Sequence, residues 1–150
     1  MADTNTRDDV HLIAAKRLRS VGLRYSNSRR AVVDVLYDTE RPLTIPEILE
    51  RDGKLSQSSV YRNLSELASS SVVHRIVAGD NYSHFELDQD LTSHHHHLVC
   101  TNCGRVEDFS TPAHLEEELD KALQKVARKS KFSVQRHRLD LLGTCEACSA

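Results

Sequence analysis

Four cysteines, arranged as two Cys-x-x-Cys pairs, constrain this chain more than any other feature of its sequence. The first pair is Cys100/Cys103 and the second is Cys145/Cys148, with 41 residues between them. Two such pairs supply the four thiolates that a tetrahedral zinc site prefers. A redox-active dithiol is the alternative, but no thioredoxin-like βαβ pattern surrounds either pair. The spacing therefore predicts a structural zinc ion that joins two distant parts of the chain.

The polar N-terminal stretch MADTNTRDDV argues against a secretion signal, and no run of about 18 apolar residues suggests a membrane-spanning segment. The chain is 39% apolar and 28% charged, which is typical of a soluble globular protein. We therefore expect a cytoplasmic protein without a membrane partner. Disulfides are disfavoured in that compartment, which also favours zinc as the role of the cysteines.

Hydrophobic periodicity predicts four helices and then a β-hairpin in the first half of the chain. The helices are expected over residues 10–21, from about Ser28, from Thr44 to Gly53, and over residues 56–70. Thr44 and Glu47 have the spacing of a capping box. Two β-rich runs around Gly79-Asp80-Asn81 predict the hairpin. This order is typical of a winged helix-turn-helix, in which the helix before the hairpin enters the major groove of DNA.

Two surfaces of this predicted domain favour double-stranded DNA as a partner. Residues 16–30 hold six basic side chains and no acidic one, although the whole chain has a net charge of −2. The predicted recognition helix carries side chains that suit base edges and phosphates. They are Gln57, Ser59, Tyr61, Arg62 and Asn63. A plain solvated helix face is the alternative for each surface.

The second half of the chain predicts a smaller α/β unit. Residues 88–93 have no periodicity and are interpreted as a hinge between a first domain, 1–87, and a second, 88–150. Short strands are expected over residues 97–100 and 105–109, followed by a long amphipathic helix and the alternating strand "FSVQRHRLDLLG". This half is too small to bury a full core alone. Its exposed strand edge and helix predict a two-fold homodimer. The two halves together predict an α+β fold class.

A run of four histidines, "SHHHHLVCTNCG", precedes the first cysteine pair. In an extended segment, alternate side chains point to opposite faces. His94 and His96 are therefore expected on one face, and His95 and His97 on the other. One strand could in this way supply ligands to two separate metal sites.

Five segments of the chain together resemble the ferric-uptake-regulator superfamily of bacterial metal-responsive repressors. They are "LRSVGLRYSNSRRAVVDVL", "SSVYRNLSEL", "HFEL", "HHHHLVCTNCGRVEDF" and "HRLDLLGTCEAC". The resemblance extends from about residue 12 to residue 148. It implies a homodimeric winged-helix repressor, not an enzyme, with a structural zinc on the four cysteines and at least one regulatory metal site.

The resemblance also implies roles for individual residues. DNA contacts fall on Tyr61 and Arg62, with Arg24 near the basic minor-groove contact of the family. A hinge metal site includes His95 and His97, and its further ligands are drawn from His74, Glu86 and Asp88. A second site combines three histidines with a carboxylate of the long helix, so that its candidates are His94, His96, His137, Glu116 and Asp120.

The identity of the regulatory metal is predicted from the hinge ligands. Iron and peroxide sensors of the family carry a histidine at the start of the third helix, where this chain has Arg41 and Pro42. His74 matches a hinge ligand of zinc-uptake regulators, and a four-coordinate N/O site suits zinc. Zinc is therefore preferred over iron(II) or manganese(II), although zinc sensors often use a hinge cysteine that this chain lacks.

Two alternatives to these assignments remain. A zinc-dependent hydrolase is the remote functional alternative, but neither a glutamate base beside a His-x-x-x-His helix nor a nucleophile motif supports it. The histidines outside the motifs have simpler interpretations. His11 and His114 are expected in solvent and His84 at the surface, whereas His137 has the pattern of a core histidine unless the resemblance makes it a ligand. The first helix carries Leu12, Ile13, Ala15 and Leu18 at helical spacing.

Overall fold

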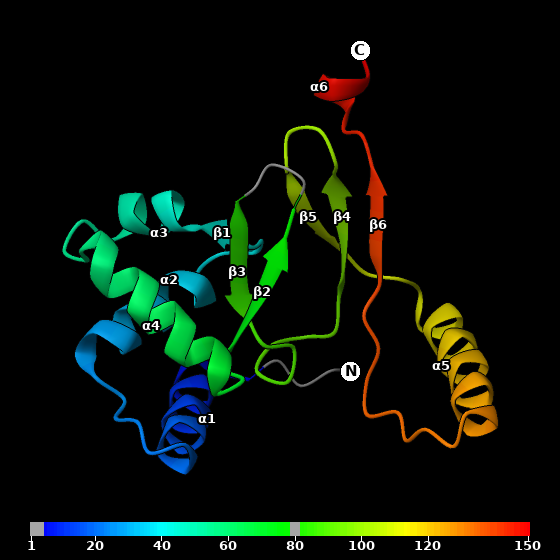
Figure 1. The fold of residues 1–150 in the computed structure, drawn as a ribbon, viewed down its shortest axis with the longest axis horizontal. Coiled ribbons are helices and arrows are strands. Elements are labelled where there is room, and N and C mark those ends of the chain that lie inside the picture. Colours follow the sequence, from blue (N-terminus) through cyan, green and yellow to red (C-terminus); the bar gives the residue numbers. More distant parts are fainter. Residues whose placement is uncertain (1–4, 79–81) are drawn as a thin grey trace.

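The computed structural model describes residues 5–78 and 82–150, so the expected hairpin turn at residues 79–81 lies outside the described residues. The N-terminal half contains, in chain order, α1 (Arg7–Ser20), α2 (Asn27–Tyr37), β1 (Leu43–Thr44), α3 (Ile45–Arg51), α4 (Gln57–Ser69), β2 (Val73–Val77) and β3 (Ser83–Leu87). The C-terminal half contains β4 (His96–Cys100), β5 (Val106–Phe109), α5 (Ala113–Lys129), β6 (Asp140–Gly143) and α6 (Glu146–Ser149). Figure 1 shows the two halves side by side, with the segment after β3 leading from one to the other.

Local polar groups define where the N-terminal helices begin. The predicted capping box of α3 is confirmed, because both Thr44 and Glu47 make its reciprocal contacts. Thr6 and Asp9 form a second capping box at the start of α1. Gly22 follows α1 with a φ of +78°, a conformation that glycine adopts without the steric cost of a side chain.

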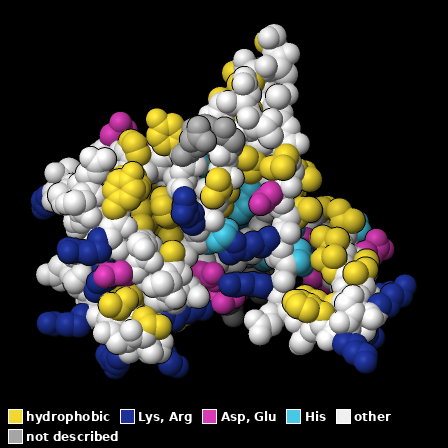
Figure 2. All heavy atoms as spheres, viewed as in Figure 1, with side chains coloured by type: hydrophobic (Ala, Val, Ile, Leu, Met, Phe, Trp, Pro, Cys, Tyr) yellow, Lys and Arg dark blue, Asp and Glu magenta, His cyan; other side chains and the backbone are white. Residues whose placement is uncertain are grey.

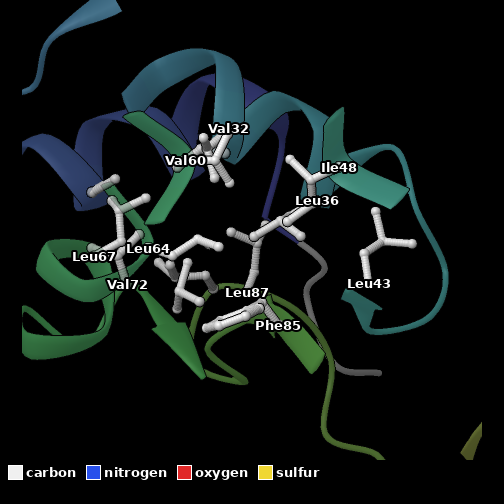
Figure 3. Close-up of a cluster of buried hydrophobic side chains, with 14 of the residues drawn as sticks. Val32, Leu36, Leu43, Ile48, Val60, Leu64, Leu67, Val72, Phe85 and Leu87 are labelled. Carbon is white, nitrogen blue, oxygen red and sulfur yellow. The ribbon is translucent and has the colours of Figure 1, made fainter. Parts of the chain in front are cut away.

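The helices of the N-terminal half pack onto a small three-stranded sheet with strand order β1-β3-β2. The hairpin pairs Val73 with Leu87 across β2 and β3, and the short β1, which the sequence did not predict, pairs Leu43 with Phe85. Val60, Leu64 and Leu67 all face the core from α4, as their spacing predicts. Figure 3 shows these side chains meeting those of α2, α3 and β3 in one apolar cluster. This cluster fixes α4 beside the hairpin.

The C-terminal half is built on a second sheet with strand order β5-β4-β6. β4 pairs antiparallel with β5 and parallel with β6. All four residues of β6 are exposed, and Leu142 is 71% exposed. Only Ala127 is buried on α5 within the described chain, and Figure 2 shows apolar side chains on the surface of that helix. These exposed apolar surfaces agree with the expected dimer contacts.

The last strand is shorter than the alternating pattern predicts. A strand is expected throughout residues 132–143, but β6 covers only Asp140–Gly143. Its pairing with β4 starts at His97 opposite Asp140, one residue after β4 begins. The N–H of His97 still donates to the carbonyl of Leu139 at 3.1 Å, and residues 132–138 precede the start of β4 in this register.

The buried residues of α1 differ in part from the apolar residues that indicated the helix. Leu12 is 70% exposed, whereas the buried positions are Val10, His11, Ala14 and Leu18. His11, Ala14 and Leu18 follow i, i+3, i+7 spacing, so the buried face of α1 includes a histidine in place of a leucine. His84 on β3 is buried as well, contrary to the surface position expected for it, and His114 is exposed as expected.

Together these elements confirm an α+β fold with an N-terminal winged helix-turn-helix and a C-terminal α/β half. In the part of the chain that the structure describes, no helix combines the length and apolar character required to cross a bilayer.

Truncation of Leu67 tests the core assignment. Leu67 is completely buried, so Leu67→Ala should lower the free energy of unfolding by about 2–5 kcal/mol, through lost burial and the cavity left behind. Leu12→Ala removes the same atoms from an exposed position and should change it by less than about 0.5 kcal/mol. Urea unfolding followed by circular dichroism measures both. Equal losses in the two variants would contradict the packing described here.

Candidate metal centres and DNA-binding face

The two cysteine pairs meet at one end of the C-terminal sheet. β4 and β6 run parallel and pair Cys100 with Gly143, so the connections after both strands leave at the same edge. Gly104 turns the chain after the first pair with a φ of +76°. The four Sγ atoms of Cys100, Cys103, Cys145 and Cys148 lie within 4.8 Å of one another.

The geometry of this cluster fits a tetrahedral thiolate site. The Sγ atoms of Cys103 and Cys145 are 3.7 Å apart, close to the edge of about 3.8 Å expected for a tetrahedron with zinc–sulfur bonds of about 2.3 Å. The backbone N–H groups of Cys103 and Cys145 donate to Cys100 Sγ at 3.5 and 3.4 Å. These hydrogen bonds lower the pKa of Cys100 to about 6, which favours the thiolate that binds a metal.

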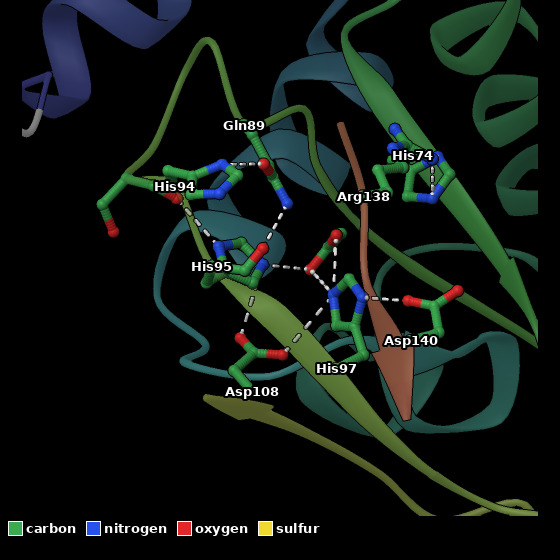
Figure 4. A network of polar contacts seen from close by, with 10 residues as sticks. His74, Gln89, His94, His95, His97, Asp108, Arg138 and Asp140 are labelled. Carbon is green, nitrogen blue, oxygen red and sulfur yellow. Dashed lines mark hydrogen bonds and ion pairs between the residues drawn. The ribbon is translucent and has the colours of Figure 1, made fainter. Parts of the chain in front are cut away.

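A second cluster joins the two halves of the molecule. It comprises Glu86 on β3, His95 just before β4, His97 on β4, and Asp108 on β5, with one ligand atom from each residue within 4.8 Å of the others. Glu86 Oε2 lies 2.9 Å from His95 Nε2 and 3.2 Å from His97 Nε2. The carboxylate of Asp108 approaches the same two nitrogens at 3.7 and 3.8 Å. Figure 4 shows His95, His97 and Asp108 converging, with Asp140 on the other side of the His97 ring. We call this group the hinge cluster.

Burial and charge act together in the hinge cluster. Burial alone would raise the pKa of Glu86, but hydrogen bonds from His95 and His97 outweigh it and lower that pKa to about 2. The hydrogen bond to Glu86 raises the pKa of His95 to about 9. Burial disfavours the charged form of His97, yet its contacts with Glu86 and Asp140 raise its pKa overall. The cluster therefore holds two imidazoles against an ionised carboxylate.

The hinge cluster includes only part of the set predicted from the sequence. His74 lies outside it, in contact with Arg138, and burial together with that guanidinium lowers the pKa of His74 to about 4. Asp88 also lies outside it and accepts a hydrogen bond of 2.9 Å from Arg136. Asp108 was missed, although it pairs with His97 across β4 and β5. The alternation of "RVEDF" beside the histidine strand is the signal that could have identified it.

The other face of the histidine run forms a third group, the α5 cluster, which consists of His94, His96, Glu116 and His137. The Glu116 carboxylate lies 2.9, 3.2 and 2.7 Å from the Nε2 atoms of His94, His96 and His137, respectively. A hydrogen bond from Thr111 is the main cause of the lowering of the Glu116 pKa to about 2. Asp120 lies outside the group and contacts Nδ1 of His137 at 2.9 Å. The alternation of residues 94–97 between two clusters is as the sequence predicts.

The donor sets and unsatisfied atoms of these clusters fit bound cations. Within the described residues the buried Asp108 Oδ1 accepts no hydrogen bond, and the buried Glu86 Oε1 has an ion-pair contact with Nε2 of His97 at 3.1 Å. A buried carboxylate oxygen without a hydrogen bond costs free energy, and a cation between the two carboxylates would offset that cost. Imidazole and carboxylate ligands suit zinc, iron and manganese, whereas four thiolates suit zinc.

The predicted DNA-contacting residues divide into exposed and buried sets. Gln57, Tyr61 and Arg62 are exposed on α4, and Arg24 is exposed in the connection before α2. Ser59 is half-buried. Asn63 is buried, and its Nδ2 donates to Ser59 Oγ at 3.2 Å. Figure 2 shows Lys and Arg side chains projecting from the surface of the N-terminal half.

A winged helix-turn-helix with these three clusters defines a metal-binding, DNA-binding protein. Comparisons with known proteins agree. The model of the ferric uptake regulator family matches residues 20–142. The peroxide operon regulator of Bacillus subtilis is 33% identical over 140 residues, which cover 91% of each chain. The ferric uptake regulation protein of the same species is 31% identical over 140 residues, covering 89% of this chain and 91% of that protein.

A solved structure supports the same conclusion. The ferric uptake regulator of Helicobacter pylori aligns with a TM-score of 0.74 at 25% identity, covering 100% of this chain and 98% of that one. The chain belongs to the ferric uptake regulator family. Members of this family are metal-dependent transcriptional repressors and not enzymes, which excludes the hydrolase alternative.

Replacement of one thiolate tests the cysteine cluster. Cys145→Ser should lose the tightly held metal, and because a structural zinc contributes folding free energy directly, the C-terminal half and the dimer should come apart. Elemental analysis and analytical ultracentrifugation measure the two effects. Glu146→Gln changes the adjacent exposed residue and should retain both metal and dimer. A metal-loaded, stable Cys145→Ser dimer would contradict the four-thiolate assignment.

The raised pKa of His95 predicts a pH dependence of metal binding to the hinge cluster. His95 carries a proton below about pH 9 in the metal-free protein, so an incoming metal must displace that proton. The apparent affinity should therefore rise by at least about tenfold per pH unit between about pH 7 and pH 9, because the pKa of His97 is raised as well. Competition titrations against a chromogenic chelator measure it, in a His96→Ala variant that disables the α5 cluster. A flat affinity over this range would contradict the protonated His95.

Proposed function

We propose that this chain is a homodimeric repressor that binds palindromic operator DNA when the hinge cluster holds a divalent metal. It would thereby control genes for metal uptake. The structural zinc is assigned to the four cysteines, and the regulatory ligands to Glu86, His95, His97 and Asp108. The domain boundary at residues 87/88 belongs to this proposal, because the hinge cluster takes ligands from both sides of it.

One observation carries the proposal. The Glu86 carboxylate comes from the winged-helix hairpin, and it lies 2.9 and 3.2 Å from imidazoles that belong to the C-terminal half. A metal bound by these groups would remove freedom between the two halves. In a dimer, that restriction selects one spacing of the two recognition helices, which is a population shift towards the form that fits a two-fold DNA site.

The number of clusters also supports regulation by metal. Three groups of potential ligands occur within the described residues, and the structure of the Helicobacter pylori regulator reveals three functional metal binding sites. The cysteine cluster is suited to structure because four thiolates close the coordination shell. The two histidine clusters mix nitrogen and oxygen donors, which release a metal more readily.

Zinc is our first assignment for the regulatory metal. Four donors within 4.8 Å of one another match the four-coordinate geometry that zinc prefers. The sequence argument for zinc loses its contribution from His74, which contacts Arg138 instead. The absence of a histidine at the start of α3 still distinguishes the chain from the iron and peroxide pattern.

Iron(II) or manganese(II) is the second candidate, because two of the four hinge donors are carboxylates. Iron(II) and manganese(II) bind more readily to carboxylate oxygens than to thiolates. The two Bacillus subtilis relatives are named for peroxide and for ferric uptake. Anaerobic DNA-binding titrations with zinc, iron(II) and manganese(II), each repeated with hydrogen peroxide, distinguish the metal and peroxide alternatives.

Removal of one hinge ligand tests the proposed function. In His97→Ala, the cysteine-bound zinc and the dimer should remain, but stimulation of DNA binding by added metal should be lost. Coupling between two sites typically amounts to about 5- to 150-fold in affinity. Fluorescence anisotropy measures it, with a DNA duplex selected by the wild-type protein from a random-sequence pool. His114→Ala removes an exposed imidazole and should retain the stimulation.

The outcome also decides between the two histidine clusters. Equal stimulation of His97→Ala and wild type would show that the hinge cluster is not the sensor. The same measurement on His96→Ala then tests the α5 cluster.

A further inference from the structure

The connection between α1 and α2, residues 21–26, is anchored on one side by a partly buried series of polar contacts among Tyr25, His11 and Asp34. The hydroxyl of Tyr25 lies 2.5 Å from Nδ1 of His11 on α1. The other ring nitrogen of His11, Nε2, lies 3.0 Å from the carboxylate of Asp34 on α2. His11 at the centre of these contacts is only 5% exposed, whereas the side chain of Asp34 is 34% exposed.

The pKa values of Asp34 and Tyr25 indicate which groups donate and which accept in these contacts. Burial would raise the pKa of Asp34, but hydrogen bonds from Arg7 and His11 outweigh it and lower that pKa. Burial raises the pKa of the Tyr25 hydroxyl, which therefore keeps its proton. The ionised Asp34 thus accepts from the Nε2–H of His11, and the Tyr25 hydroxyl keeps a proton in its contact with Nδ1.

A second anchor holds the same connection from the opposite side. The guanidinium of Arg29, in the first turn of α2, donates to the backbone carbonyl of Arg24 and to the carboxylate of Glu66 on α4. The Arg29 side chain is 12% exposed. Arg29 therefore joins the backbone of residue 24 directly to the recognition helix.

The two anchors act on neighbouring residues. The carbonyl of Arg24 is fixed to α4, and the side chain of Tyr25 is fixed to α1 and α2, whereas the side chain of Arg24 is exposed. Arg24 and Arg62 line the same polar hollow of about 660 Å³. A cation presented from a fixed backbone loses less conformational entropy when it binds a phosphate or a groove.

We propose that Tyr25, His11 and Glu66 are positioning residues for DNA recognition, which hold Arg24 in register with the recognition helix α4. None of the three needs to contact DNA. The proposal rests on the proposed function, in which Arg24 and α4 bind the operator. It assigns a function to His11, a buried histidine that takes no part in the metal clusters.

A double-mutant cycle tests whether Tyr25 acts through Arg24. Tyr25→Phe removes one hydroxyl and should weaken binding of the metal-loaded dimer to the selected duplex by about five- to tenfold. Arg24→Ala alone should weaken it by about 5- to 150-fold. If Tyr25 positions Arg24, adding Tyr25→Phe to Arg24→Ala should change the affinity by less than about twofold, because interacting sites are not additive.

Two further variants complete the design. Tyr37→Phe removes a hydroxyl that donates to the carbonyl of Asn5 at 3.3 Å and should leave DNA binding unchanged in both backgrounds. Glu66→Gln weakens the second anchor, in which Arg29 joins Glu66 to the carbonyl of Arg24. It should weaken DNA binding by a similar factor, and only when Arg24 is present. Thermal unfolding verifies that each variant is folded, and analytical ultracentrifugation verifies that it is dimeric.

Each outcome has a distinct meaning. Equal losses from Tyr25→Phe with and without Arg24 would overturn the positioning proposal, because the hydroxyl would then act on stability in general. Unchanged binding in Arg24→Ala would overturn it as well, by removing Arg24 from the DNA interface. Arg62→Ala and the metal titrations of His97→Ala report on the proposed function separately, so a failure there is recognised independently.

Discussion

The arrangement of the two halves depends on the carboxylate of Glu86, which lies between His95 and His97. Glu86 is 7% exposed and His97 is 2% exposed, so the charges of this group are poorly solvated. Isolated buried charges are costly, and they persist only when each has a partner. In the metal-free protein, the protonated imidazoles of His95 and His97 balance the charge of the Glu86 carboxylate. On the proposed function, a divalent cation would replace those protons and bind both carboxylates, which would make the contact between the two halves sensitive to metal.

β4 distributes ligands to all three clusters. Its alternation sends His97 towards Glu86 and His96 towards Glu116, and its last residue, Cys100, begins the cysteine cluster. The neighbouring strands complete this division, since Asp108 lies opposite His97 on β5 and Gly143 lies opposite Cys100 on β6. A slip of one residue in β4 would exchange the two histidine faces. The two cysteine pairs resist such a slip, because they come together only in this register.

Short-range patterns predicted most of the fold, and long-range contacts account for what was missed. The capping box of α3, the apolar face of α4 and the alternation of the histidines depend on neighbours in sequence, and all were predicted. Asp108 belongs to the hinge cluster because β5 pairs with β4, which the sequence did not predict. His74 and Asp88 lie outside the cluster because they contact Arg138 and Arg136, which are more than 45 residues away in the sequence. His11 was expected in solvent because its partners, Tyr25 and Asp34, come together only in the folded helices.

Residues 136–140 contact both histidine clusters and the N-terminal half of the molecule. Arg136 bonds to Asp88 and Arg138 contacts His74, both in the winged-helix half or its boundary, whereas His137 between them points to Glu116. Asp140 then accepts from His97 at 3.0 Å. Because side chains of an extended segment alternate, these residues connect both histidine clusters to the DNA-binding half. We therefore expect a change in either cluster to act on the same short segment, which contacts Asp88 and His74 of the other half or its boundary.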